Sequence, residues 1–150
     1  MYASTLEKKV TKFVRRFGIK RAFCTDAFEY QNGVINFTIL SHPLDETFID
    51  FINNKYNTDI AAWHFIFSLL HEVGHHVTFP VLSEDDLKWE YVIRMFGNPT
   101  NEEYFSLPAE DLANRWAINY IEKHPQECWD FQNKCYKIMR HIFKKKSFHY

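Results

Sequence analysis

The chain has 150 residues, a net charge of −1 with its histidines neutral, and 18% aromatic residues. This length is typical of one domain and suffices for a sizeable core. The near-zero charge gives no overall electrostatic case for nucleic-acid binding, and no apolar stretch reaches the roughly 20 residues that span a bilayer. We expect one domain over residues 1–150, with no direct nucleic-acid binding and no membrane association.

The cysteine content favours a reducing compartment. There are three cysteines, Cys24, Cys128 and Cys135, and an odd number without a secretory leader argues against a disulfide framework. Cys128 and Cys135 are too far apart in sequence for the close C-x-x-C spacing of a structural zinc site. We therefore expect buried or incidental thiols and a cytoplasmic protein.

The first third of the chain predicts a helix, a small sheet and a second helix. Thr5–Phe17 is a basic amphipathic segment, and we expect its apolar side to pack on the core rather than on a membrane. Two strand-like runs, Lys20–Phe28 and Val34–Leu40, flank the turn signal Asn32-Gly33, which predicts a β-hairpin. Thr47–Lys55 is typical of a short helix, with its aromatic side chains on one side.

The next segment carries the most informative motif, His71-Glu72-Val73-Gly74-His75. It lies in Ile60–Val77, which is apolar on nearly every side and predicts a buried helix. Two histidines four residues apart lie on one helical face and can bind a single metal ion, while the adjacent glutamate can take a proton from water. We expect this helix to begin after the capping candidates at residues 57–59.

Between this motif and the next, a helix is predicted over Glu84–Phe96, with Leu87, Tyr91 and Met95 facing inward. Residues 97–107 then predict a polar loop, because Gly97-Asn98-Pro99 breaks the helix. Tyr104 in this loop is a weak candidate for stabilising an oxyanion.

A catalytic zinc usually has three protein ligands, so the sequence must supply one more. The extended H-E-x-x-H-x-x-G-x-x-H pattern is absent. The best candidate is Glu110, on a predicted helix that begins near Pro108 and continues with small residues on the same face. Asn114, one turn later, can accept a hydrogen bond from a ligand histidine. Glu102 and Glu103 remain alternatives to Glu110. Beyond this face the chain predicts helix to residue 146, with a break near residues 124–125.

The two motifs together resemble the ImmA/IrrE family of small zinc metallopeptidases, whose pattern is H-E-x-G-H followed by E-x-x-A-N-x-[FW]-A. The resemblance covers residues 60–120 and rests on His71, Glu72, Gly74, His75, Glu110, Ala113, Asn114, Trp116 and Ala117. It departs from the family in the 83–107 insertion, within the 35 positions that separate His75 from Glu110 (110 minus 75).

The resemblance implies Zn²⁺ bound by His71, His75 and Glu110, with Glu72 as general base. It also implies an endopeptidase that acts on a protein substrate such as a helix-turn-helix repressor. With the predicted elements, it indicates an α+β fold, namely a mostly helical zincin-like domain with a small sheet packed on the H-E-x-x-H helix. Two alternatives stay open. One is a catalytically silent zinc-binding regulatory protein, and the other is an interaction module in which the motif is accidental.

Overall fold

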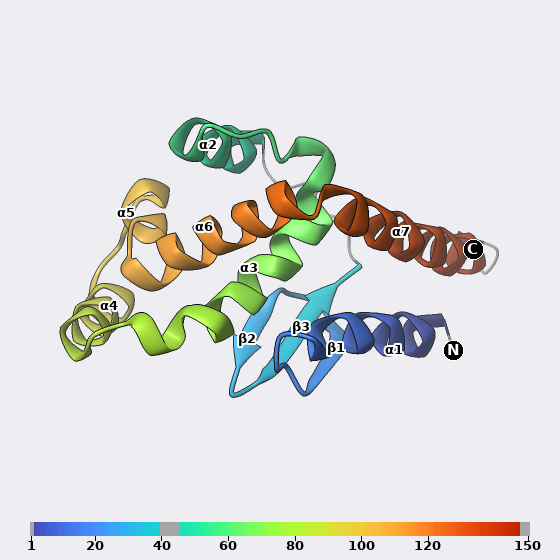
Figure 1. The fold of residues 1–150 in the computed structure, drawn as a ribbon, viewed down its shortest axis with the longest axis horizontal. Helices are drawn as coiled ribbons and strands as arrows, with labels where there is room; N and C mark the ends of the chain where they lie inside the picture. Colours follow the sequence, from blue (N-terminus) through green and yellow to red (C-terminus); the bar gives the residue numbers. More distant parts are fainter. Residues whose placement is uncertain (1, 40–45, 148–150) are drawn as a thin grey trace.

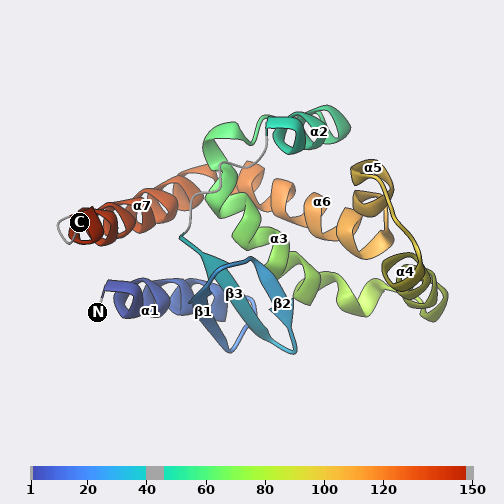
Figure 2. The ribbon, with the colours of Figure 1, turned by 180° about the vertical axis from the view of Figure 1, so that it is seen from behind.

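Helix α3 (His64–Thr78) runs through the middle of the molecule, and the other elements are arranged around it (Figure 1). The computed structural model describes residues 2–39 and 46–147. The sheet and helix α2 lie on opposite sides of α3, and the view from behind shows the same arrangement (Figure 2). Helices α1 and α7 lie towards one end of the molecule and helices α4 and α5 towards the other.

The fold is mostly helical with one three-stranded sheet, which confirms the expected α+β class. In chain order the remaining elements are α1 (Tyr2–Arg15), β1 (Arg21–Thr25), β2 (Glu29–Gln31), β3 (Val34–Thr38), α2 (Glu46–Tyr56), η1 (Ala61–Trp63), η2 (Phe79–Val81), α4 (Glu84–Phe96), α5 (Asn101–Phe105), α6 (Pro108–Lys123) and α7 (Pro125–Ser147). The predicted break near residues 124–125 separates α6 from α7. Within the described ranges, no helix is both long and apolar enough to cross a membrane.

The central helix is shorter than the sequence predicted. The expected helix from Ile60 begins instead with the short 3₁₀ turn η1, and α3 starts at His64 without a side-chain cap. Asp59 accepts a hydrogen bond from the backbone N–H of Ala61, 3.1 Å away, so the capping candidate serves the 3₁₀ turn rather than α3. The apolar residues of α3 form the centre of the core, as expected for a helix that is hydrophobic on most sides.

The sheet topology differs from the predicted hairpin. The run Lys20–Phe28 divides into β1 and the approach to β2, and β3 lies between them in the order β1-β3-β2. Strand β1 pairs with β3 in parallel, whereas β2 forms the antiparallel hairpin with β3. The Asn32-Gly33 turn is where the sequence placed it, and both residues have positive φ, of 51° and 82°. Leu40, the predicted end of the second strand, lies outside the described residues.

Helix α1 covers the β1 edge of this sheet, and β2 forms the opposite edge. The hydroxyl of Thr11 accepts a hydrogen bond from the N–H of Ala22 at 3.0 Å, and Glu7 accepts one from the N–H of Cys24 at 3.0 Å. These side chains take up backbone donors that would otherwise leave β1 an open edge. Strand β2, at the other edge, lies beside the central helix. The hydroxyl of Tyr30 of β2 forms a hydrogen bond with His76 of α3, at 2.6 Å.

Helix α4 has the predicted boundaries, but it buries a different face from the one we expected. Leu87, Tyr91 and Met95, which we expected to face inward, are 37%, 60% and 62% exposed. The buried residue is Glu90, which accepts a hydrogen bond from the backbone N–H of Ala109 in the first turn of α6. A carboxylate at a helix N-terminus satisfies a donor that has no partner within the helix. The predicted loop over 97–107 also contains helix α5.

Candidate metal centre

Helices α3 and α6 bring three side-chain atoms together in a small triangle. His71 Nε2 lies 3.1 Å from His75 Nε2, and Glu110 Oε2 lies 2.9 Å from the first and 3.0 Å from the second. The two histidines are one helical turn apart on α3, and Glu110 lies in the first turn of α6. The structure thus brings together His71, His75 and Glu110, the three residues that the sequence put forward as ligands.

Close packing of the two helices makes this triangle possible. A Cβ atom built on Gly74 would lie 2.8 Å from the carbonyl oxygen of Ala113 and 2.9 Å from its Cα. Real Cβ atoms do not approach backbone atoms so closely, so only glycine fits at position 74. The small face of α6 is buried as predicted, with Ala113, Asn114 and Ala117 fully inaccessible.

A hydrogen bond sets the protonation of the first histidine. Nδ1 of His71 lies 2.6 Å from Oδ1 of Asn114, and the amide nitrogen of Asn114 donates to the hydroxyl of Tyr56 at 3.2 Å. With its amide oriented in this way, Asn114 can only accept from His71, so the ring proton lies on Nδ1. The expected hydrogen bond between Asn114 and a histidine of the motif is present, and Nε2 of a neutral His71 is left with a lone pair aimed at the triangle.

The triangle consists of atoms that can bind a metal ion. Oε2 of Glu110 is buried and accepts no hydrogen bond from any described residue, although two ring nitrogens lie near it. Three lone-pair-bearing atoms this close repel one another unless a cation or a proton lies among them. Ligand atoms at about 2.0–2.2 Å from a tetrahedral zinc lie roughly 3.3–3.6 Å apart. The observed separations of 2.9–3.1 Å are a few tenths of an ångström shorter, so the three side chains would move slightly apart around a bound ion.

The charge balance of the metal-free site follows from the same contacts. Burial lowers the pKa of the His71 ring, but the adjacent Glu110 carboxylate outweighs burial, so the pKa is raised above its ordinary value. Burial raises the pKa of Glu110, but the rings of His71 and His75 outweigh it, so the pKa of this carboxyl is lowered. In the absence of metal the cluster therefore favours a protonated His71 and a charged Glu110.

Glu72 lies beside the triangle rather than in it. A carboxylate oxygen of Glu72 lies within 4.8 Å of ligand nitrogens of both His71 and His75, whereas Oε2 of Glu110 is within 3.0 Å of both Nε2 atoms. By distance Glu110 is therefore a closer third partner for the two histidines than Glu72. Burial raises the pKa of the Glu72 carboxyl, which makes it a stronger base than an exposed glutamate.

Two residues of the 83–107 insertion hold the other oxygen of Glu110. Arg94 of α4 donates to Oε1 of Glu110 at 3.0 Å, and the hydroxyl of Tyr104 of α5 donates to the same atom at 2.8 Å. Arg94 also donates to the Tyr104 hydroxyl at 3.0 Å. No sequence pattern pointed to Arg94, because its contact with Glu110 depends on how α4 packs against α6. Tyr104, considered for an oxyanion, instead contacts Glu110.

The other residues weighed from the sequence lie outside the triangle. Glu103 forms the local cap at the start of α5 with Thr100, and both Glu102 and Glu103 are exposed. Their exposure, and the contact of Glu103 with Thr100, leave neither Glu102 nor Glu103 at the triangle.

Two hollows meet at the candidate centre. The larger, a cleft of about 500 Å³, runs between β2 and the η2–α4 segment and is lined by Tyr30, Glu72, His75, Arg94 and Glu110 among others. The smaller, of about 280 Å³, is lined by Phe28, Phe48, Phe67, Ser68, His71, Glu72, Tyr104, Phe105 and Glu110. Glu72 and Glu110 line both, so a ligand that extended from one hollow into the other would pass the triangle.

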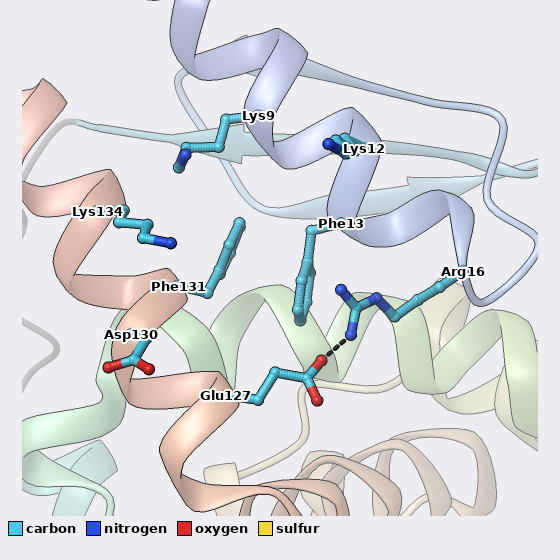
Figure 3. Close-up of a pocket in the computed structure, with 8 residues that line it drawn as sticks. All are labelled: Lys9, Lys12, Phe13, Arg16, Glu127, Asp130, Phe131 and Lys134. Atoms are coloured by element: carbon cyan, nitrogen blue, oxygen red, sulfur yellow. Dashed lines mark ion pairs between the residues drawn. The ribbon is translucent and has the colours of Figure 1, made fainter.

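A third hollow lies away from this centre, between α1 and α7 (Figure 3). Its volume is about 310 Å³, and basic side chains from both helices surround it, with an ion pair between Arg16 and Glu127. Phe13 and Phe131 stack inside it with centroids 4.0 Å apart. It shares no lining residue with the two hollows at the candidate centre.

Comparison of the chain with protein-family models, with curated proteins and with solved structures finds no match. The function must therefore be argued from the site itself.

Proposed function

We propose that this protein is a zinc-dependent endopeptidase, with Zn²⁺ held by His71, His75 and Glu110 and with Glu72 as general base. The observation that carries the proposal is the part-buried triangle of two imidazole nitrogens and one carboxylate oxygen, at 2.9–3.1 Å from one another. Three protein ligands of this kind with a further position for water are typical of a catalytic zinc site.

When bound, zinc supplies an electrophile that polarises the scissile carbonyl and acidifies water. Glu72 takes a proton from the attacking water at a carboxylate oxygen and passes it to the leaving amine. Its raised pKa suits both steps, because the carboxylate must accept a proton readily and then release it. Asn114 keeps the His71 ring in the tautomer and orientation that a ligand needs.

The cleft supports a peptide substrate. Strand β2 is an edge strand, and Glu29, Tyr30 and Gln31 of this strand line the cleft that contains Glu72 and Glu110. An extended peptide can add to such an edge through main-chain hydrogen bonds, which would place its backbone beside the metal ligands. The resemblance in the two motifs makes a helix-turn-helix repressor our proposed substrate.

Metal content tests the site first. We expect about one zinc per chain in the purified protein, and a large loss of zinc in His71→Ala and Glu110→Ala. Glu122→Ala is the matched control, because Glu122 is an exposed glutamate of the same helix α6. A protein that retains no zinc after purification with added metal would overturn the proposal and favour an accidental motif.

Cleavage then tests the chemistry. The zinc-loaded protein is incubated with a peptide library and with purified helix-turn-helix repressors, and new termini are identified by mass spectrometry. We expect Glu72→Gln to keep its zinc and lose cleavage, because the amide cannot accept the proton. A Glu72→Gln protein as active as the parent would sink the assignment of the base. Bound zinc without cleavage of any substrate would favour a silent regulatory protein.

A further inference from the structure

Four phenylalanines from four parts of the chain converge beside the candidate centre. Phe28 precedes β2, Phe48 lies on α2, Phe67 on α3 and Phe105 on α5. With Ser68 and Tyr104 they enclose the hollow of about 280 Å³ that His71, Glu72 and Glu110 also line. We call this hollow the aromatic pocket.

We propose that the aromatic pocket binds one large apolar side chain of the substrate, next to the bond that is cleaved. This inference rests on the proposed peptidase function and adds the class of substrate to it. Glu72 and Glu110 line both the pocket and the cleft, so a side chain inside the pocket belongs to a residue whose backbone lies beside the proposed metal ligands.

The size and walls of the pocket favour an aromatic or long aliphatic group. A cavity of about 150 Å³ can hold a benzene ring, and this pocket is larger, at about 280 Å³. Its walls are already assembled, because the Phe105 ring packs on Phe48 at a centroid distance of 5.1 Å and on Phe51 at 5.9 Å. A preformed apolar pocket avoids the entropic cost of assembling one on binding.

Charge selects against acidic side chains. Apart from the site residues themselves, the polar groups that line the pocket are Ser68 and Tyr104, and neither carries a positive charge. A carboxylate entering the pocket would lose hydration without gaining an ion pair. It would also approach Glu72 and Glu110. We therefore expect discrimination between apolar and acidic groups of similar length.

The test uses three small hydroxamic acids as probes, because a hydroxamate chelates zinc and anchors each probe at the centre. Acetohydroxamic acid carries only a methyl group, 3-phenylpropionohydroxamic acid carries a phenyl group, and succinic monohydroxamic acid carries a carboxylate. Their dissociation constants are measured by calorimetry on the zinc-loaded protein. We expect the phenyl probe to bind at least about tenfold more tightly than the methyl probe, because its ring leaves water. The carboxylate probe should bind no more tightly than the methyl probe.

Two variants assign the preference to the pocket. Ser68→Leu places a larger side chain in the pocket, and Phe105→Ala removes part of one wall, so each should reduce the ratio of the phenyl and methyl constants. Phe143→Ala is the control, since Phe143 is an exposed phenylalanine of α7 that lines neither hollow, and it should leave the ratio unchanged. Circular dichroism checks that each variant is folded. If only one of the two pocket variants folds, its ratio alone is sufficient to test the assignment.

The outcomes separate this inference from the proposed function. Equal binding of the phenyl and methyl probes to the zinc-loaded protein would overturn the aromatic pocket and leave the metal centre standing. A phenyl preference that survives in a folded pocket variant would also overturn it. A protein that binds neither zinc nor any of the three probes would overturn both the inference and the proposed function.

Discussion

At the scale of single residues, the candidate centre depends on side chains that hold the ligands in place. Asn114 orients His71 and is itself bonded to Tyr56, whose hydroxyl donates to Asp111 at 2.8 Å. Such partners of metal ligands typically contribute 10–100-fold to metal affinity. Glu110 has its own pair of partners in Arg94 and Tyr104.

Arg94→Met should weaken zinc binding. By donating to Oε1, Arg94 orients the Glu110 carboxylate so that Oε2 faces the two imidazoles. Loss of this contact should lower zinc affinity by roughly 10–100-fold, as for other partners of metal ligands. The dissociation constant is measured by competition with a chromophoric chelator.

The sign of this change is diagnostic. Removing a positive charge near a cation should by itself strengthen zinc binding, so tighter binding in Arg94→Met would contradict a positioning role. In a Glu110→Gln background the same substitution should have little further effect. Arg16→Met is the control, because Arg16 also forms an ion pair with a glutamate, but in the hollow between α1 and α7.

The stability of the metal-free and zinc-loaded proteins should depend on pH in opposite directions. The folded-state pKa of His71 is raised above its ordinary value of 6.5. Its contribution to stability is therefore fully present below that value and is lost as the pH rises through the folded pKa. Zinc requires neutral imidazoles, so zinc binding instead strengthens as the pH rises.

Thermal melting in chelator and in excess zinc, from about pH 6 to about pH 8, checks this prediction. The melting temperature of the metal-free protein should fall relative to that of His71→Ala as the pH rises, while the shift produced by zinc should grow. Parallel pH dependence with and without zinc would show that His71 does not exchange a proton for metal.

At the scale of secondary-structure elements, the contact between α3 and α6 sets the geometry of the centre. Gly74→Ala would gain roughly 1 kcal/mol of helix propensity, but its methyl group would press on the backbone of Ala113. Overpacking of this kind costs about 1–3 kcal/mol. We expect a net loss of stability in chemical denaturation together with weaker zinc binding, because Glu110 lies one turn from Ala113.

The second substitution Ala113→Gly should fail to rescue Gly74→Ala, since the atoms that Gly74→Ala would contact belong to the backbone. A more stable Gly74→Ala protein, with unchanged zinc affinity, would show that α6 can move away at little cost.

The sequence predicted the helices better than their packing. The boundaries of α4 matched because Ser83 forms a capping box and Gly97 follows the helix, and both are local signals. Its buried face did not match, because Glu90 is buried through its bond to α6, a contact that periodicity cannot reveal. Likewise the prediction of the Asn32-Gly33 turn rested on a local signal and was correct. The parallel pairing of β1 with β3 was not predicted, because these strands are not consecutive in the chain.

In the candidate centre, too, local signals were predictive, and the contact between α4 and α6 was not predicted. His71 and His75 share one helical turn, so their spacing alone predicted their approach. Glu110 was selected because a catalytic zinc needs a third ligand and because its helix has a small-residue face. Arg94 could not have been found in this way, since its contact with Glu110 joins two helices across the loop and helix α5 between them.

At the scale of the whole molecule, the first and last helices, α1 and α7, pack against each other. Cys128 and Cys135 of α7 are fully buried, and burial raises the pKa of their thiols to about 11 and about 12. Both should resist iodoacetamide in the native protein at about pH 8 and react after denaturation, because the thiolate is the reactive form. Mass spectrometry of the labelled peptides gives the readout. Rapid native labelling of Cys135 would contradict the packing of α7 on the core.

The three proposed ligands also tie together two helices that are separated in sequence by η2, α4 and α5. A metal bound only by the folded chain adds about 1.4 kcal/mol of stability for each tenfold increase in free zinc above the dissociation constant. The lifetime of the protein in a cell would then follow the supply of zinc. A fall in that supply would lower the amount of folded protein through degradation, and recovery would require new synthesis.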